Sequence, residues 1–213
     1  MTTRAIVLAA GKGTRMESEL PKVLHEVGGR PMLEWVLDAL GTAGCERQLV
    51  VVGHGAEQVR ERMGGRAVDW VVQAEQLGTG HALAQVEGEL TSAATLLVVS
   101  GDVPLVSPRT LAELGRAAAG AWGAMAVARL DRPGSLGRVV RGDDGGLRRI
   151  VEGADTREEE LAIATVNAGL YALPAPEVFE LLRGVGRDNA KGEVYLTAAL
   201  DAAVAAGETV ALV

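Results

Sequence analysis

The chain has 213 residues, 48% hydrophobic but only 3% aromatic, which is enough to bury one large core made of Ala, Val and Leu. A net charge of -7 argues against nucleic-acid or anionic-membrane partners, since these are held by dense Lys and Arg. The single cysteine excludes an internal disulfide, and the absence of a signal peptide or of an apolar run near ~20 residues predicts a cytoplasmic protein.

The first half of the chain alternates apolar strands with amphipathic helices. Strands are predicted at residues 5–9, 49–52, 70–72 and 95–99, and helices at 31–40, 56–63, 80–90 and 109–119. In the first helix Leu33, Val36, Leu37 and Leu40 share one face, and Pro31 stands where a first helical turn tolerates it. Strands that are apolar on both faces indicate an α/β fold with a mostly parallel central sheet covered by helices on both faces.

The second half of the chain is less regular. Strands are predicted at 124–130, 138–141, 147–152, 164–173 and 209–213, and helices at 156–161, 176–182 and 195–206. The turn sequence at 143–146 predicts a hairpin between the second and third of these strands. We expect a smaller, irregular sheet beside the first one. Because no linker divides the chain, we expect one domain over residues 1–213.

A glycine-rich segment, LAAGKGTRM at residues 8–16, follows the first strand directly. Gly11 and Gly13 let backbone N–H groups approach a bound anion, and Lys12 and Arg15 add positive charge. Lys22 places a third cation nearby, and such cations repel each other unless an anion joins them. This chemistry suits a triphosphate. A strand-to-helix turn with solvated cations would have the same local sequence.

Three side chains further along the chain are candidates for ligand binding. Asp102 follows an apolar strand, at the end where open α/β sheets bind ligands, and its carboxylate suits Mg²⁺; alternatively, it is a turn residue before Pro104. Gln73 carries an amide that offers both a donor and an acceptor to a uracil edge, or it is an ordinary polar residue after a strand. Thr79 is placed to cap the following helix.

The segments LAAGKGTRM (8–16), PKVLH (21–25) and QAEQLGTGHA (73–82) together resemble the bacterial N-acetylglucosamine-1-phosphate uridylyltransferases, in particular the N-terminal nucleotidyltransferase domain of the bifunctional enzyme. The resemblance runs from end to end. It implies a Rossmann-like nucleotide-diphospho-sugar transferase fold, with a nucleotide-binding half at about 1–120 and a sugar-binding half at about 121–213. It also implies transfer of UMP from UTP to N-acetylglucosamine 1-phosphate with Mg²⁺, as a step of peptidoglycan synthesis.

The resemblance assigns roles to particular residues. It implies catalytic roles for Arg15 and Lys22 and a metal-binding role for Asp102. The implied nucleotide-binding residues are Leu8, Ala9, Ala10, Gly11, Lys12, Gly13, Lys22, Gln73, Gly78 and Thr79. The implied sugar-binding residues are Gly137, Glu152, Asn167, Tyr195 and Thr197. A solvated Glu152 and a strand-edge Asn167 remain alternative interpretations.

Several positions depart from the family pattern. Leu136, Ala168 and Ala198 each stand where relatives usually carry a polar group at the sugar end. Relatives also continue past the position of Val213 to an Asn that completes the metal site and to a β-helix acetyltransferase domain. We therefore expect no acetyltransferase activity and no oligomer built on that β-helix.

Three other functions compete with uridylyl transfer to N-acetylglucosamine 1-phosphate. The first is a UTP- or UDP-sugar-binding domain with little turnover, and the second is a uridylyl- or thymidylyltransferase for another sugar 1-phosphate. The third is a nicotinamide-dependent oxidoreductase, which is disfavoured because Met16 occupies the third-glycine position of the GxGxxG fingerprint.

Overall fold

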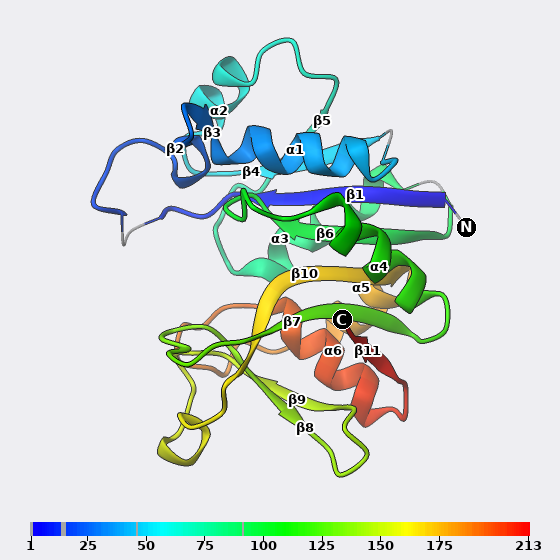
Figure 1. Cartoon of the computed structure of the whole chain (residues 1–213). Helices are drawn as coiled ribbons and strands as arrows, with labels where there is room; N and C mark the ends of the chain where they lie inside the picture. Colours follow the sequence, from blue (N-terminus) through cyan, green and yellow to red (C-terminus); the bar gives the residue numbers. More distant parts are fainter. Residues whose placement is uncertain (1, 14–15, 46, 91) are drawn as a thin grey trace.

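The computed structural model describes residues 2–13, 16–45, 47–90 and 92–213. Its centre is a nine-stranded sheet in which seven strands follow the order β11-β7-β10-β6-β1-β4-β5 and the hairpin β8-β9 branches from β10 (Figure 1). The strands of this sheet are β1 (Thr2–Ala9), β4 (Gln48–Val52), β5 (Asp69–Val72), β6 (Ala94–Ser100), β7 (Gly123–Arg129), β8 (Arg138–Arg141), β9 (Leu147–Val151), β10 (Thr165–Ala175) and β11 (Val210–Leu212).

Strand direction in the sheet is mostly parallel. β1 runs parallel to β4 and β6, β4 to β5, and β7 to β11, whereas β10 lies antiparallel between β6 and β7. The α/β fold with a mostly parallel sheet is therefore confirmed. The expectation of a separate sheet in the second half was wrong, because β7, β10 and β11 extend the first sheet and only the β8-β9 hairpin leaves it.

The core lies on both faces of the sheet, as the apolar strands predict. The helices are α1 (Met32–Thr42), α2 (Ala56–Arg62), α3 (Thr79–Ala84), α4 (Pro108–Ala118), α5 (Glu177–Gly184) and α6 (Leu196–Ala205). Ile6 and Val98 belong to the buried cluster that includes α3, α5 and α6, whereas Val7 and Val99 belong to the cluster that includes α1, α2 and α4. Alternate residues of one strand thus pack on opposite helix layers.

Some local structure differs from the sequence prediction. The helix expected at 80–90 begins at Thr79, ends at Ala84 and is followed by a separate 3-10 turn at Glu87–Glu89. The helix expected at 156–161 is a 3-10 turn at Glu158–Glu160. A 3-10 turn at Lys22–Leu24 and a small hairpin of β2 (Glu26–Val27) and β3 (Arg30–Pro31) were not predicted.

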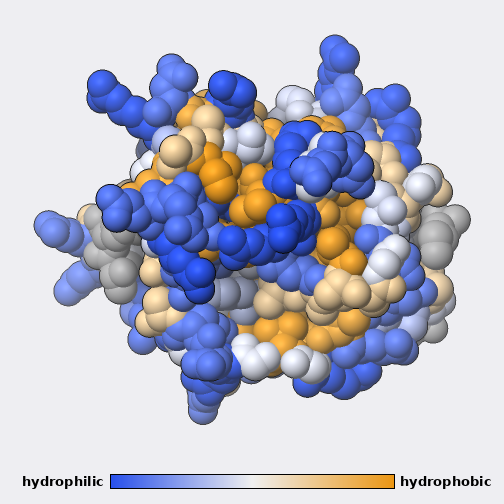
Figure 2. Space-filling view, turned by 90° about the horizontal axis from the view of Figure 1, so that it is seen from below, coloured by the Kyte–Doolittle hydropathy of each residue, from blue (hydrophilic) through white to orange (hydrophobic). Residues whose placement is uncertain are grey.

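The molecular surface carries apolar and charged residues close together. On the face shown in Figure 2, hydrophilic residues divide the hydrophobic surface into separate patches. In the part of the chain that the structure describes, the helices are too short or too polar to cross a membrane.

Candidate active site

A cavity of about 480 Å³ opens at the carboxyl ends of β1 and β6. All residues predicted to bind the nucleotide line this cavity, and so does Asp102, the predicted metal ligand. Parallel strands bring the segments that follow them to one edge of the sheet, which is where open α/β sheets bind ligands. The predicted catalytic residue Arg15 lies outside the described residues.

The glycine-rich segment forms one wall of the cavity. Gly13 adopts a left-handed backbone with φ of 62°, and a Cβ added there would lie 2.7 Å from the Cβ of Lys22. At Gly11 an added Cβ would meet no described atom within 4 Å. Glycine is therefore required at residue 13 for close approach to Lys22, whereas residue 11 leaves the backbone open to a ligand.

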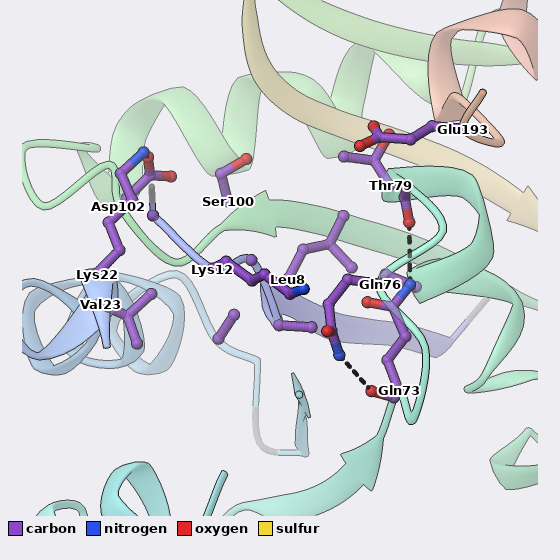
Figure 3. A pocket seen from close by; sticks show the side chains of 16 residues that line it. Leu8, Lys12, Lys22, Val23, Gln73, Gln76, Thr79, Ser100, Asp102 and Glu193 are labelled. Atoms are coloured by element: carbon purple, nitrogen blue, oxygen red, sulfur yellow. Dashed lines mark hydrogen bonds and ion pairs between the residues drawn. The ribbon is translucent and has the colours of Figure 1, made fainter. Parts of the chain in front are cut away.

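Lys22 and Asp102 lie in contact with each other on one side of the cavity (Figure 3). Lys22 begins the 3-10 turn in which Val23 and Leu24 are buried, and its Nζ forms an ion pair with Asp102 Oδ2. Asp102 follows β6, where the Gly101 N–H donates to the Leu8 carbonyl at 2.9 Å. The anion that offsets the charge of Lys22 is thus a carboxylate of the protein itself, which the sequence analysis did not foresee.

Gln73 is almost fully buried, with 2% of its surface exposed. Its Nε2 donates to the Gly78 carbonyl at 3.1 Å and lies 2.9 Å from His81 Nδ1, while Gln76 Nε2 donates to the Gln73 carbonyl at 3.0 Å (Figure 3). Among the described residues none donates to Gln73 Oε1. Among the described residues Oε1 is therefore the polar atom of this amide that has no partner, whereas both polar atoms were expected to be available to a base.

Sequence reasoning missed the residues that hold Gln73. Gln76 and His81 both lie within the segment 73–82. The number of polar residues in that segment was therefore the feature of the sequence that could have pointed to them. Ser100 also lines the cavity, at the end of β6, and was given no role.

Thr79 does not cap its own helix. Gly78 is the N-cap of α3, and Thr79 is the first helical residue. Its Oγ1 instead accepts a hydrogen bond from the N–H of Leu196, the first residue of α6, at 3.0 Å. The predicted N-cap role was therefore wrong, and the hydroxyl joins two segments that are far apart in sequence.

Four of the predicted sugar-binding residues come together beside β9. Glu152 Oε1 accepts a hydrogen bond from Thr197 Oγ1 at 2.7 Å. A Cβ added to Gly137 would lie 3.6 Å from Glu152 Oε2 and 3.7 Å from the Cβ of Asn167. Glycine at residue 137 thus leaves space between Glu152 and Asn167.

Asn167 is occupied within the protein. Its Nδ2 donates to the Tyr171 hydroxyl at 2.7 Å, and its Oδ1 accepts from the Gly169 N–H at 2.9 Å. These contacts stabilise the bulge of β10, where Gly169 adopts a φ of 72°. The side chain that was expected to offer a donor and an acceptor to a sugar therefore already uses one N–H and one lone pair within the protein, which leaves the second N–H and the second lone pair.

The predicted sugar-binding residues do not line the 480 Å³ cavity. Glu152, Tyr195 and Thr197 line a second cavity of about 290 Å³, and Gly137 and Asn167 line neither. The Tyr195 hydroxyl is buried without a partner among the described residues, and burial, together with the nearby Asp155 carboxylate, raises its pKa.

Asp201 also lines the second cavity, from α6. Its Oδ1 accepts a hydrogen bond from the Ile150 N–H at 2.8 Å. Burial raises the pKa of Asp201 to about 6, because it disfavours the charged carboxylate more strongly than the Ile150 N–H favours it. Within the described residues, groups of three or more His, Cys, Asp or Glu arranged for a metal are absent.

Known proteins match this chain in sequence and in fold. Residues 5–170 match the MobA-like NTP transferase domain. The chain is 47% identical over 210 residues to the Bifunctional protein GlmU of Exiguobacterium sibiricum, which covers 97% of this chain and 46% of that protein. It is 44% identical over 195 residues to the Bifunctional protein GlmU of Bacillus thuringiensis, and this match covers 90% of this chain and 42% of that protein.

Among solved structures, a UDP-glucose pyrophosphorylase complexed with UDP-glucose has a similar fold. Its TM-score is 0.76 at 18% identity, over 100% of this chain and 91% of that chain. At that identity the likeness concerns the fold alone. The chain spans about half the length of the curated relatives it matches, and the domain match continues across residue 120, where the two predicted halves meet.

Proposed function

This chain belongs to the MobA-like NTP transferase domain family, and on that premise we propose that it transfers UMP from UTP to N-acetylglucosamine 1-phosphate, releasing pyrophosphate. The observation that carries the proposal is the 480 Å³ cavity, which brings together the glycine-rich segment, Lys22, Asp102 and the buried amide of Gln73. The identity of 47% to a Bifunctional protein GlmU supports the same activity.

Catalysis in this proposal is positioning and charge neutralisation. An oxygen of the sugar phosphate attacks the α-phosphorus of UTP, the bond from that phosphorus to the bridging oxygen breaks, and pyrophosphate leaves with the electron pair. Lys22 and Lys12 supply positive charge where the triphosphate gains negative charge, and the backbone at Gly11 is open to the phosphates. A protein nucleophile is not required. Arg15 is proposed to act with Lys22.

Asp102 is the residue proposed to hold Mg²⁺. Its carboxylate lies in the cavity beside Lys22, and Mg²⁺ is commonly bound by one or two carboxylates together with substrate phosphates. The residues therefore fit a metal shared between the protein and the nucleotide. When bound, Mg²⁺ neutralises phosphate charge and polarises the phosphoryl oxygens.

Gln73 is the residue proposed to select uracil. Its Nε2 is engaged by Gly78 and His81, so its Oε1 faces the ligand as an acceptor. Uracil carries an N3–H donor, whereas N3 of cytosine is an acceptor that would repel Oε1. Thymine shares the uracil edge, so this amide discriminates UTP from CTP but not from TTP.

The sugar is proposed to lie near Glu152 and Thr197, which are held together by a hydrogen bond. The internal contacts of Asn167 favour a smaller role for that side chain than the family pattern implies. We propose small-molecule substrates rather than nucleic acid or membrane partners, and the proposal requires no oligomer.

Product analysis tests the function directly. The chain is incubated with UTP, N-acetylglucosamine 1-phosphate and Mg²⁺, and UDP-N-acetylglucosamine and pyrophosphate are quantified. Parallel reactions replace the sugar phosphate by glucose 1-phosphate and UTP by TTP. Faster turnover with either replacement would support a transferase for another sugar or nucleotide, and UTP binding without product would support a binding domain.

A further inference from the structure

The hydroxyl of Thr79, a residue of α3, accepts a hydrogen bond from the first N–H group of another helix, α6. The N–H of Leu196 opens α6, where an N–H has no partner within the helix, and the N-cap residue Tyr195 makes no side-chain cap. Thr79 Oγ1 accepts this N–H at 3.0 Å from a position 117 residues away in sequence. In Figure 3 Thr79 and Glu193 lie on the side of the cavity opposite Lys22 and Asp102.

The backbone around Thr79 is bound to the same segment. The Val194 N–H donates to the Leu77 carbonyl at 2.7 Å, and the Gly80 N–H donates to the Val194 carbonyl at 2.8 Å. A Cβ added to Gly78 would lie 2.5 Å from the Val194 carbonyl oxygen, so only glycine permits this approach. Residues 77–80 and 194–196 therefore form one hydrogen-bonded unit, here called the strap contact.

The strap contact lies between the two cavities. On one side, Gly78 accepts the hydrogen bond from the buried Gln73 amide. On the other side, Thr197 follows Leu196 directly and donates to Glu152 at 2.7 Å. Glu193 lines the 480 Å³ cavity, whereas Tyr195 and Thr197 line the 290 Å³ cavity. A shift of the Leu196 N–H therefore displaces Thr197 with respect to Glu152.

We infer that the Thr79 hydroxyl is a positioning group for the sugar phosphate, which acts through Leu196 and the Thr197–Glu152 hydrogen bond and not through contact with uracil. The inference rests on the proposed function and assigns to Thr79 a role on the sugar side of the site. It requires that loss of the hydroxyl weakens recognition of the sugar while recognition of the nucleotide persists.

The test compares Thr79→Val, which keeps the shape but removes the acceptor, with Thr79→Ser, which keeps the acceptor. Affinity for UDP and for UDP-N-acetylglucosamine is measured by calorimetry, and the KM for each substrate by kinetics. Thr79→Val should weaken the affinity for UDP-N-acetylglucosamine about fivefold, as expected for the loss of one helix cap. The affinity for UDP should change by less than about twofold. Thr79→Ser should restore parent values.

Two further variants separate positioning from general stability. In the parent chain the Thr110 N–H donates to Ser107 Oγ at 3.0 Å, and Ser107→Ala removes this side-chain cap of α4. The variant should lower the melting temperature without changing the ratio of the affinities for UDP and UDP-N-acetylglucosamine. Thr197→Val breaks the contact to Glu152. If Thr79 acts through Thr197, the double variant Thr79→Val with Thr197→Val loses no more sugar affinity than Thr197→Val alone.

Three outcomes would each overturn the inference while leaving the proposed function intact. In the first, Thr79→Val weakens the affinities for UDP and for UDP-N-acetylglucosamine equally, and in the second, Thr79→Ser fails to restore affinity. In the third, the double variant loses sugar affinity by the product of the two single losses. If the parent chain binds UDP-N-acetylglucosamine no better than UDP and forms no product, the proposed function fails, and the inference falls with it.

Discussion

Lys22 and Asp102 form an ion pair within the cavity, with 32% and 29% of their side-chain surfaces exposed. The pair joins the residue proposed to neutralise phosphate charge to the residue proposed to hold the metal. Because both side chains are partly solvated, the pair contributes about 0–1 kcal/mol to the free energy of unfolding. We therefore expect the ion pair to affect the arrangement of charges in the site and to add little to the stability of the fold.

Replacing Lys22 should separate activity from stability. Lys22→Ala should lower kcat by about a hundredfold or more, because a charge that offsets the triphosphate is lost, while the free energy of unfolding changes by less than about 1 kcal/mol. Initial rates and melting temperatures measure the two effects. Arg109→Ala, which breaks the exposed ion pair with Glu113, is the matched control and should keep parent rates. A folded Lys22→Ala chain with parent activity would remove Lys22 from the mechanism.

The ion pair also predicts competition between Lys22 and a divalent cation for the Asp102 carboxylate. In Lys22→Met, Mn²⁺ used as a spectroscopic probe should bind the free protein about two- to fivefold more tightly, because no lysine has to be displaced. Asp102→Asn should lose this binding. An electron paramagnetic resonance titration measures free Mn²⁺ in each variant. Unchanged affinity in Lys22→Met would show that the metal does not use Asp102.

Gln73 should govern the preference for UTP over CTP. Gln73→Ala should lower kcat/KM for UTP and narrow its ratio to kcat/KM for CTP by about tenfold, since one discriminating base contact is removed. Gln85→Ala is the control, because Gln85 also lies beside His81 but does not line the cavity. The same ratio in parent and Gln73→Ala would place base recognition elsewhere.

Two glycines of the same segment should respond differently to alanine. At Gly11 the added methyl has open space, so Gly11→Ala should keep the parent melting temperature, and a loss of UTP affinity there would report contact with the nucleotide. Gly13→Ala should lower the free energy of unfolding by about 1–2 kcal/mol, because the backbone there is left-handed and the added methyl would meet Lys22. It should lower turnover as well. Thermal denaturation and UTP calorimetry measure both; equal melting temperatures for the two variants would contradict the structure.

Asp201 should make the stability of the protein depend on pH. Its pKa in the folded chain is raised to about 6 from an ordinary 3.8, so the native state holds the proton more tightly than the unfolded state does. The resulting stabilisation is complete below pH 3.8 and is lost as the pH rises through about 6. The difference amounts to at most about 3 kcal/mol.

Asp201→Asn tests this dependence, because the amide oxygen can still accept the Ile150 N–H. The variant should be as stable as the parent near pH 4 and more stable above pH 7, as measured by urea denaturation across that range. A parent chain that gains stability relative to the variant as the pH rises would reverse the sign and refute the assignment.

The sequence by itself determined the layered α/β architecture and, together with the family resemblance, many of the residues that line the 480 Å³ cavity. Apolar residues at successive positions of Ile6, Val7 and Leu8 require cover on both faces of a strand, which favours a parallel sheet between helix layers. Gly11, Gln73 and Asp102 each follow a predicted strand, so the common direction of the strands brings them to one edge. The local periodicity of the strands and the alternation of strands and helices along the chain were sufficient for that conclusion.

The tertiary structure alone decided how those residues are paired. The position of β10 between β6 and β7, the ion pair of Lys22 with Asp102 and the hydrogen bond from Leu196 to Thr79 all join segments that are distant in the chain. Local sequence patterns report which face a residue buries, but they carry no information on which distant group satisfies a particular donor or charge. That choice depends on the order of the strands and on the close backbone approach that Gly78 permits, because hydrogen bonds require their atoms within about 3 Å.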